Sequence, residues 1–212
     1  MPLKLKGSNK DNFMDEKVAL EETVLSFFPT RFGNFKLYVF KNRVDGIEHV
    51  ALTTEQIGNI PLVRVQSECL TGEVLESLRC DCGFQLKKAM QLIADSKNGV
   101  LIYLRSHEGR GIGLTNKVRA YALQDEGFDT VTANNRLGFE ADLRDYSVGV
   151  AILKKLGIET ITLLTNNLKK IEALENGGII VKERLPLHVP LTRYNSKYLQ
   201  TKKEKLGHLI DT

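Results

Sequence analysis

The sequence has no stretch of about eighteen consecutive apolar residues, the length that a membrane-spanning helix requires. Its first nineteen residues carry charges throughout and hold no apolar run of about seven residues, so we expect no secretory signal there. Cysteine is scarce, with three among 212 residues, and a disulfide framework is therefore not expected. These absences predict a cytoplasmic protein with reduced thiols and no membrane partner.

The sequence also has only a small excess of charge of one sign. The 30 lysines and arginines exceed the 26 acidic residues by four, and this net charge of +4 is spread along the whole chain. Domains that bind nucleic acid normally carry a basic patch or stripe, so no nucleic-acid partner is expected. The small excess fits an anionic ligand and an ordinary soluble surface equally well. The hydrophobic content of 42% is enough for a substantial core.

All three cysteines, Cys69, Cys80 and Cys82, fall within one window of fourteen residues. Zinc normally has four ligands, and a catalytic zinc takes three from the protein and leaves the fourth position to water. Alternate residues of an extended segment point the same way, so Cys80 and Cys82 can face one ion, while a turn at Gly72 can bring Cys69 back. The cysteines alone also fit a disulfide with a spare thiol, or three buried thiols that act as small apolar side chains.

Strand and helix signals alternate along most of the chain, after residues 1–18, which we expect to form a disordered extension. Branched and aromatic residues predict strands at residues 35–40, 63–65, 100–104 and 160–164. Apolar periodicity, helical composition and glycine stop signals predict helices at residues 84–95, 114–125, 146–156 and 169–175. Asp145 is the expected N-cap of the third helix. This alternation predicts an α/β protein, and no linker divides residues 19–212.

Two polar loops each follow an expected strand and precede an expected helix. Residues 107–113 read HEGRGIG, which places small residues, an arginine and backbone amides ahead of a helix N-terminus, a place suited to phosphate. The glycine spacing matches neither the dinucleotide fingerprint nor the Walker A loop, and a tight glycine turn explains it as well. Residues 165–170, TNNLKK, form a second loop of this kind, suited to an anion or another ligand.

Taken in order, these segments resemble GTP cyclohydrolase II, the zinc enzyme that begins riboflavin synthesis from GTP. The resemblance runs from about Thr30 to His208. The matching positions are Thr30, Gly33 and Phe35; Arg64 to Gly72, apart from Gln66; Ser77 and Arg79; Cys80 to Gly83, with Gln85 and Leu86; Glu108 to Leu114; Lys117, Arg119 to Tyr121, Leu123 and Gln124; Asp129 to Val131, Ala133 and Asn134; Leu137, Gly138, Asp142 and Arg144; Leu164 to Asn167, with Lys169 and Lys170; and Asn195, Tyr198, Leu199, Thr201, Lys202, Lys205, Gly207 and His208.

The resemblance implies a role for many of these residues. Cys69, Cys80 and Cys82 are expected to hold one catalytic zinc ion per subunit, which activates water to attack carbon C8 of guanine. Nucleotide binding is expected of Arg64, Val65, Gln66, Ser67, Glu68, Gln85, Glu108, Gly109, Arg110, Thr130, Thr165 and Lys170. Tyr121 is expected to assist ring opening, and a core position on its helix would explain it as well.

Asp142 and Arg144 are the pair expected to break the bond between the α- and β-phosphates. Arg144 would act as the nucleophile, with Asp142 as proton acceptor, or would stabilise charge on the phosphates while water attacks. A surface salt bridge is the third interpretation of this pair. Mg²⁺ is expected on the triphosphate oxygens. The implied products of GTP are formate, pyrophosphate and a diamino-ribosylamino-pyrimidinone phosphate.

The resemblance further implies a single compact α/β domain of mixed, coiled sheets flanked by helices, a catalytic domain over residues 19–212, and a homodimer. Two positions depart from the family, which most often has histidine where Gln66 stands and commonly has aspartate where Glu73 stands. Two alternatives remain. One is a specialised relative that stops at a formylated ring-opened product or retains the triphosphate. The other is a non-catalytic nucleotide-binding protein whose structural zinc has a fourth protein ligand, for which His107 is the candidate.

Overall fold

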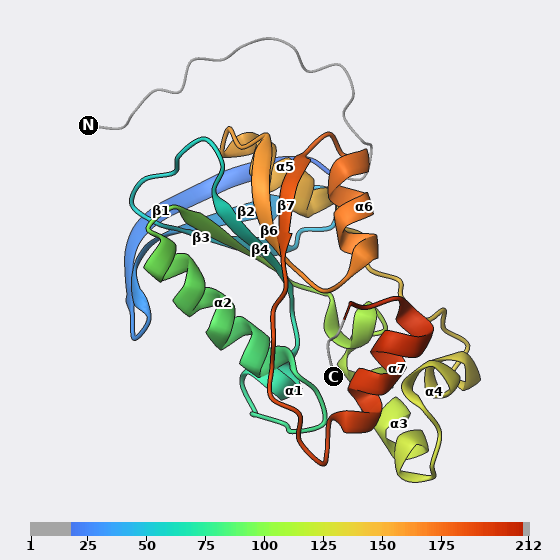
Figure 1. The fold of residues 1–212 in the computed structure, drawn as a ribbon. Helices are drawn as coiled ribbons and strands as arrows, with labels where there is room; N and C mark the ends of the chain where they lie inside the picture. The colour runs from blue at the N-terminus through green and yellow to red at the C-terminus, as the bar shows by residue number, and fades with distance from the viewer. Residues whose placement is uncertain (1–17, 210–212) are drawn as a thin grey trace.

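The sheet at the centre of the molecule combines an antiparallel half with a parallel half. The computed structural model describes residues 18–209, and within them seven strands form one sheet in the order β1-β2-β3-β5-β4-β6-β7 (Figure 1). The strands are β1 (Leu20–Thr30), β2 (Gly33–Asn42), β3 (Glu48–Thr53), β4 (Leu62–Ser67), β5 (Gly99–Leu104), β6 (Thr160–Leu164) and β7 (Ile180–Leu185). The pairs β1–β2, β2–β3 and β3–β5 are antiparallel, and the pairs β5–β4, β4–β6 and β6–β7 are parallel.

The parallel half brings the carboxyl ends of β4, β5 and β6 to the same end of the sheet. Ser67, the last residue of β4, pairs with Leu104, the last residue of β5. In open parallel sheets, ligands bind in the crevice outside these carboxyl ends. The loops that begin at Glu68, Arg105 and Thr165 are therefore placed to form a site.

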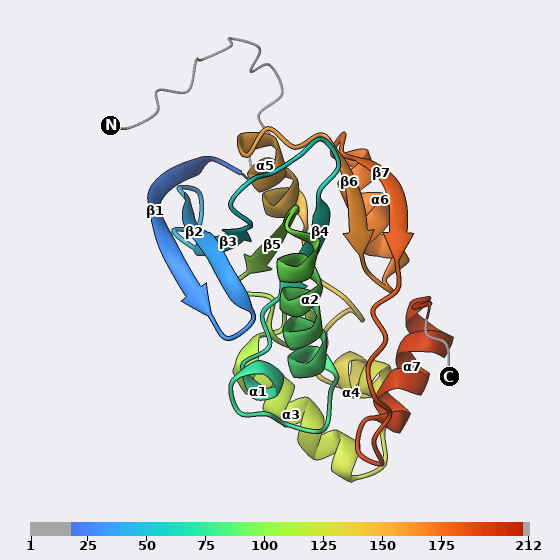
Figure 2. The same cartoon turned by 60° about the vertical axis from the view of Figure 1, so that its left-hand side comes forward.

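Helices cover both faces of the sheet and extend beyond its carboxyl end. In chain order they are α1 (Leu70–Glu73), α2 (Cys82–Ser96), the short 3₁₀ helix η1 (Glu108–Arg110), α3 (Gly113–Asp125), α4 (Thr130–Arg136), α5 (Ser147–Lys155), α6 (Leu168–Asn176) and α7 (Ser196–Leu206). α2 lies on one face of the sheet, and α5 and α6 lie on the other (Figure 2). α1, α3, α4 and α7 gather beyond the carboxyl ends of the parallel strands (Figures 1 and 2).

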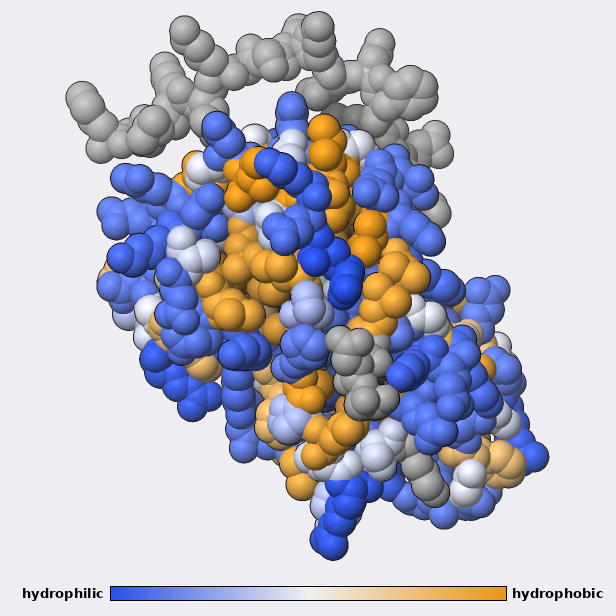
Figure 3. All heavy atoms as spheres, in the orientation of Figure 1, coloured by the Kyte–Doolittle hydropathy of each residue, from blue (hydrophilic) through white to orange (hydrophobic). Residues whose placement is uncertain are grey.

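Each face of the sheet buries an apolar cluster. Ile93 of α2 packs in the cluster that contains Leu101 of β5, whereas Ile152 of α5 packs in the opposite cluster with Ile102. Because β5 is covered on both faces, its side chains are apolar apart from the Tyr103 hydroxyl, as expected of a strand inside a sheet. On the surface, apolar residues gather over the sheet and α2, whereas the region around α7 is mostly hydrophilic (Figure 3).

The predicted α/β class and the single domain are confirmed. The strand predicted at residues 160–164 is β6, residue for residue, and the other predicted strands and helices lie within or across β2, β4, β5, α2, α3, α5 and α6. One detail is wrong: α5 begins at Ser147, so Tyr146 rather than Asp145 occupies the N-cap position, although the Tyr146 side chain makes no capping bond and the Asp145 carboxylate accepts the hydrogen bond from Ser147 N–H. The expected disordered extension falls on residues outside the described part, except for residue 18.

Seven elements of the described part were not predicted: β1, β3, β7, α1, η1, α4 and α7. β1 and β7 are the edge strands of the sheet and carry charged residues, and α7 is strongly charged, so none shows a clear apolar pattern. In the described part of the chain, no helix is both long and apolar enough to cross a bilayer.

Candidate active site

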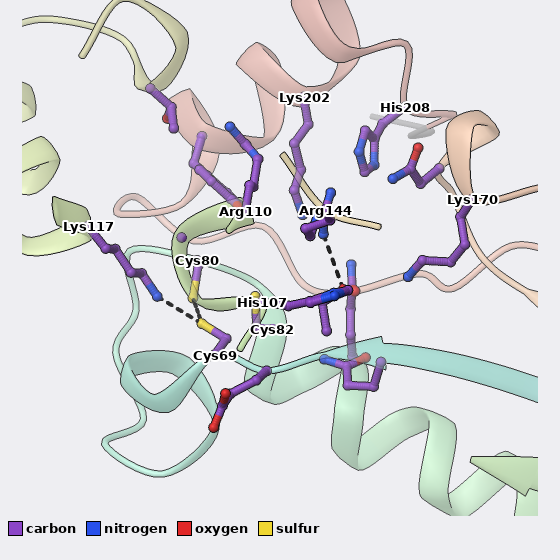
Figure 4. A pocket seen from close by; sticks show the side chains of 18 of the residues that line it. Cys69, Cys80, Cys82, His107, Arg110, Lys117, Arg144, Lys170, Lys202 and His208 are labelled. Atoms are coloured by element: carbon purple, nitrogen blue, oxygen red, sulfur yellow. Dashed lines mark hydrogen bonds between the residues drawn. The ribbon is translucent and has the colours of Figure 1, made fainter. Parts of the chain in front are cut away.

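The three cysteines lie together beyond the end of β4 and at the start of α2. Cys69 is the N-cap of α1, and Cys80 and Cys82 flank the N-cap of α2. The three sulfur atoms lie within 4.8 Å of one another, and the Sγ atoms of Cys69 and Cys80 are 3.8 Å apart (Figure 4). All three are free thiols, so the disulfide interpretation is wrong.

The sulfur spacing fits a tetrahedral metal ion. With zinc–sulfur bonds of about 2.3 Å, the sulfurs of a tetrahedral site lie about 3.8 Å apart. Among residues 18–209, no other histidine, cysteine or carboxylate joins this group of possible ligands. Three protein ligands would therefore leave one position to water. The structure brings the predicted ligands together, and zinc itself stays a prediction.

Gly72 makes the close approach of the sulfurs possible. A Cβ atom at this position would lie 2.5 Å from Cys80 Sγ and 3.3 Å from Cys69 Sγ. The first of these distances is too short for a real contact, so a larger residue would force the sulfurs to move. The chain reversal that the sequence suggested at Gly72 is the single turn of α1.

Lys117 of α3 places a positive charge beside the sulfur group. Its Nζ donates to Cys69 Sγ at 3.0 Å, to Thr71 Oγ1 at 2.6 Å and to Glu108 Oε1 at 2.5 Å. Burial alone would lower the pKa of Lys117, but the Cys69 thiolate and Glu108 raise it above its ordinary value. Hydrogen bonds from the other two thiols, together with Lys117, lower the pKa of Cys69. The site thus favours a Cys69 thiolate paired with an ammonium group.

His107 is engaged elsewhere and does not belong to the sulfur group. Its Nδ1 lies 3.2 Å from Ser67 Oγ, and its ring meets the Tyr146 ring edge-on at 5.7 Å between centroids. Burial lowers the pKa of His107 to about 3, so the imidazole is neutral. No fourth side chain in the described part of the chain closes the metal position, and the structural-zinc alternative is not favoured.

Tyr121 lies beside the sulfur group on α3. Its hydroxyl is 3.4 Å from Thr71 Oγ1, and the Arg79 guanidinium carbon lies 4.8 Å from the centre of its ring. The side chain lines the cavity next to the cysteines and belongs to neither apolar cluster. Its hydroxyl is therefore available to a ligand.

A chain of hydrogen bonds connects the side chains beneath this cavity. Tyr103 Oη and Gln66 Nε2 donate to the Glu73 carboxylate at 2.5 and 2.6 Å. Arg64 in turn donates to Gln66 Oε1 at 2.9 Å and to Gln85 Oε1 at 2.6 Å. Burial raises the pKa of Glu73 to about 7. Three predicted nucleotide-binding residues, Arg64, Gln66 and Gln85, therefore hold one another in place and still line the cavity.

The cavity is lined by an excess of positive charge. Its cationic residues are Arg64, Arg110, Lys117, Arg144, Lys170 and Lys202, and Glu68 is the acidic residue among its lining side chains. Several of these cations point toward the same space (Figure 4). Because buried charges of one sign repel one another, such a cavity is suited to a polyanion.

Among the cationic residues of the cavity, Arg110 most clearly lacks an anionic partner. Its side chain is buried, yet neither Nη1 nor Nη2 has a hydrogen-bond partner among the described residues. The guanidinium carbon lies 5.6 Å from the centre of the Tyr198 ring. A guanidinium can bind phosphate through two parallel hydrogen bonds, which would satisfy both free nitrogens.

Arg144 and Asp142 form a two-pronged ion pair. Arg144 Nε lies 2.8 Å from Asp142 Oδ1, and Nη2 lies 2.5 Å from Oδ2. The side chains are only 12% and 10% exposed, so the surface salt-bridge interpretation is wrong. Burial alone would lower the pKa of Arg144, but the Asp142 carboxylate raises it above its ordinary value. Arg144 lines the cavity, and Asp142 lies behind it.

The remaining predicted nucleotide-binding residues fall into two groups. Ser67, Glu68, Gly109, Thr130, Thr165 and Lys170 line the cavity. Val65 and Glu108 do not. The Val65 side chain is buried in the apolar core, and its carbonyl accepts a hydrogen bond of 2.6 Å from Lys170 Nζ. Glu108 accepts from Leu70 N–H and Lys117, so these two residues support their neighbours.

Some cavity residues had no predicted role. They include Lys117, Gln124, Asn134, Tyr198, Lys202 and His208. Most lie on α3, α4 and α7, whose contribution to the site depends on tertiary packing. The sequence signal that could have identified them is the match to the family motifs at these positions.

Comparison with known proteins gives the family of the chain. The family model described as GTP cyclohydrolase II matches residues 21–186. The GTP cyclohydrolase-2 of Azotobacter vinelandii is 57% identical over 187 residues, which cover 87% of this chain and 89% of that protein. The GTP cyclohydrolase-2 of Shewanella frigidimarina is 53% identical over 187 residues, which cover 87% and 92%.

Longer relatives contain the same region. The riboflavin biosynthesis protein RibBA of Bacillus subtilis is 53% identical over 197 residues, which cover 90% of this chain and 48% of that protein. The chain thus spans about half the length of this curated relative. A crystal structure of RibBX, a two-domain 3,4-dihydroxy-2-butanone 4-phosphate synthase from A. baumannii, has a TM-score of 0.47 and 19% identity, and covers 83% of this chain and 42% of that one. With a family model over residues 21–186 and relatives above 50% identity, the chain belongs to the GTP cyclohydrolase II family.

Proposed function

We propose that this protein is a zinc-dependent GTP cyclohydrolase II, with a catalytic domain over residues 19–212. It would open the imidazole ring of GTP and release formate and pyrophosphate in the first step of riboflavin biosynthesis. The observation that carries the proposal is a single cavity with three clustered thiols at one side and six cationic side chains around it. Such a cavity has a place for an activated water and a place for a triphosphate.

The cysteine side of the cavity serves ring opening. A zinc ion held by Cys69, Cys80 and Cys82 would supply an activated water molecule for attack at carbon C8. Lys117 keeps Cys69 in its thiolate form by donating to its sulfur. The Tyr121 hydroxyl, 3.4 Å from Thr71 Oγ1, is placed to donate a hydrogen bond to the purine as its ring opens.

The cationic side of the cavity binds the triphosphate. The two free nitrogens of Arg110 and the buried ammonium of Lys170 provide donors for phosphate oxygens. Burial, together with the nearby charges of Arg64 and Arg144, lowers the pKa of Lys170, and an arriving polyanion would favour its charged form. Mg²⁺ would bind to the triphosphate oxygens and share in balancing their charge.

For the release of pyrophosphate, the ion pair favours an electrostatic role for Arg144. A nucleophilic guanidinium has to lose a proton, and the contact with Asp142 opposes that loss by raising the pKa of Arg144. Arg144 would therefore stabilise charge on the phosphates while water attacks. Quenching with denaturant at mildly alkaline pH during turnover tests this role, because a nucleophilic Arg144 would leave a covalent guanylyl adduct, with an acid-labile P–N bond, that mass spectrometry detects.

The activity is tested by incubating the protein with GTP, zinc and magnesium while formate and pyrophosphate are followed together. We expect both in equal amounts from the wild-type protein, and no formate from the Cys80→Ser variant. Formate without pyrophosphate, or a formylated product, would identify the specialised relative instead. If no ring-opened product forms at any metal concentration, the protein is not a cyclohydrolase.

Two further properties belong to the proposal. A homodimer is supported by the edge strand β1, where Leu25 and Phe27 are 54% and 66% exposed, because exposed apolar side chains on an edge strand favour association. Light scattering would give the mass of a dimer. A cytoplasmic location is supported by the three free thiols, which persist in a reducing compartment.

A further inference from the structure

Asp81 lies between two of the clustered cysteines and does not cap the helix that it precedes. An aspartate at the N-cap usually accepts a hydrogen bond from a backbone N–H in the first turn of its helix. The Asp81 side chain makes no such bond to α2. Its Oδ2 accepts from Gln85 Nε2 at 2.6 Å, and its Oδ1 accepts from Lys202 Nζ at 2.6 Å. A favourable local interaction is thus replaced by a contact with a distant part of the chain.

Lys202 reaches this carboxylate from α7, which lies 121 residues further along the sequence. The ion pair is buried, with the Lys202 side chain 8% exposed and the Asp81 side chain 1% exposed. Lys202 extends from α7 toward the cavity (Figure 4). A second ion pair of α7, between Lys205 and Asp129, lies at the surface and joins α7 to the start of α4. Of these two ion pairs, only the buried one reaches the cysteine loop.

The residues after α7 hold its C-terminal end against another part of the site. Leu209 N–H donates to the Asn166 carbonyl at 2.8 Å, and His208 forms a β-bridge with Asn167. Asn166 and Asn167 belong to the loop after β6, which also lines the cavity. The C-terminal segment thus spans the cavity from the cysteine loop to the β6 loop.

We propose that Lys202 is a positioning residue that holds the Cys80–Asp81–Cys82 segment in the geometry that binds the metal. This inference rests on the proposed zinc site. Metal-bound thiolates are negative, and a buried carboxylate between two of them is unfavourable without a cation of its own. Lys202 supplies that cation to Asp81, as Lys117 does to Cys69. The C-terminal helix is then part of the active site.

The test measures the zinc dissociation constant by competition with a chromophoric chelator, and the absorption spectrum of the Co²⁺-substituted protein. Lys202→Met should weaken zinc binding by about 10- to 100-fold, the usual effect of removing a residue that supports a metal ligand, and should change the Co²⁺ spectrum. Asp81→Asn combined with Lys202→Met should recover most of the affinity, because no unpaired carboxylate is left. Lys202→Arg should lose less than Lys202→Met. Lys205→Met removes the exposed ion pair of the same helix and should bind zinc normally.

Wild-type zinc affinity and Co²⁺ spectrum in a folded Lys202→Met variant would overturn the proposal. So would a double variant that binds zinc as weakly as Lys202→Met. If Lys202→Met does not fold, as judged by circular dichroism, the Lys202→Arg and double variants decide by the same measurements. The proposed function fails separately, when the wild-type protein itself neither binds zinc nor converts GTP.

Discussion

Gln66 Nε2 donates a hydrogen bond of 2.6 Å to Glu73 Oε1, so the two residues that depart from the usual family pattern contact each other. Glu73 Oε2 also accepts from the Cys69 backbone N–H at 3.2 Å, which connects this pair to the thiol site. The acidic side chain at position 73 reaches the amide at position 66. The two departures are therefore best understood as one coupled change.

A double-mutant cycle tests this coupling. Gln66→His and Glu73→Asp should each lower the free energy of unfolding, because each breaks a buried hydrogen bond and leaves its partner unsatisfied. The double variant should lose less than the sum of the two, with a coupling of about 0.5–3 kcal/mol, as is typical of residues in contact. Denaturant unfolding at pH 7 provides the measurement. Additive losses, within about 0.5 kcal/mol, would show that the two residues act independently.

Gly72→Ala should remove the metal site without unfolding the protein. The new Cβ would meet Cys80 Sγ at 2.5 Å and Cys82 Cβ at 3.2 Å, so the thiols must separate. We expect substoichiometric zinc by elemental analysis and loss of formate production. Gly149→Ala is the matched control, since a Cβ there meets Val65 Cγ1 at an ordinary 3.5 Å. Full zinc content in Gly72→Ala would contradict the role of this glycine.

Arg110→Met should weaken substrate binding without weakening the fold. The buried guanidinium has two nitrogens without partners, so its removal takes away a desolvated charge and no internal hydrogen bond. The free energy of unfolding should stay constant or rise. Binding of a non-hydrolysable GTP analogue should weaken by about 1.5–3 kcal/mol, roughly ten- to hundredfold, because a hydrogen bond to a charged group is lost.

Arg119→Met, at an exposed arginine of α3, is the control for the Arg110→Met experiment. It should leave the nucleotide affinity and the free energy of unfolding unchanged. Calorimetric titration gives the affinity, and denaturant unfolding gives the stability. A destabilised Arg110→Met variant with normal nucleotide affinity would assign Arg110 to the fold instead of the ligand.

The sequence best predicted the elements whose buried positions produce a local pattern of apolar residues. The strand at residues 160–164 is buried, bounded by a glycine and a polar loop, and was located without error. β7 (Ile180–Leu185) carries three charged residues and is largely exposed at the edge of the sheet, so its strand pairing depends on β6. α4 (Thr130–Arg136) contains branched residues and asparagines that disfavour helix, and its cap at Asp129 compensates.

The residues of the site also differ in how far the sequence could predict their roles. The three cysteines are close in sequence, so their spacing alone suggested a metal ligand set. Lys117 lies 48 residues from Cys69, and Lys202 lies 121 residues from Asp81, so no local pattern connects them. Family motifs marked both lysines as matching positions without indicating what they contact. The partner of each depends on how α3 and α7 pack beyond the end of the sheet.

The buried histidine should make stability depend on pH. Burial lowers the pKa of His107 to about 3 in the folded protein, whereas an unfolded histidine has a pKa of about 6.5. Below pH 6.5 the unfolded chain therefore binds more protons, so the contribution of His107 is complete above pH 6.5 and is lost as the pH falls toward 3. The loss amounts to about 1.4 kcal/mol per pH unit.

Denaturant unfolding at pH 7.5 and 5.5 measures this loss against His107→Asn. The wild-type protein should lose about 1.4 kcal/mol more than the variant between these two pH values, because only the wild type has this imidazole to protonate on unfolding. His188→Asn, at an exposed histidine, controls for the substitution itself and should follow the wild type. Parallel losses in the wild type and His107→Asn would mean that His107 is protonated in the folded protein, and its contact with Ser67 would then have to be a donated hydrogen bond.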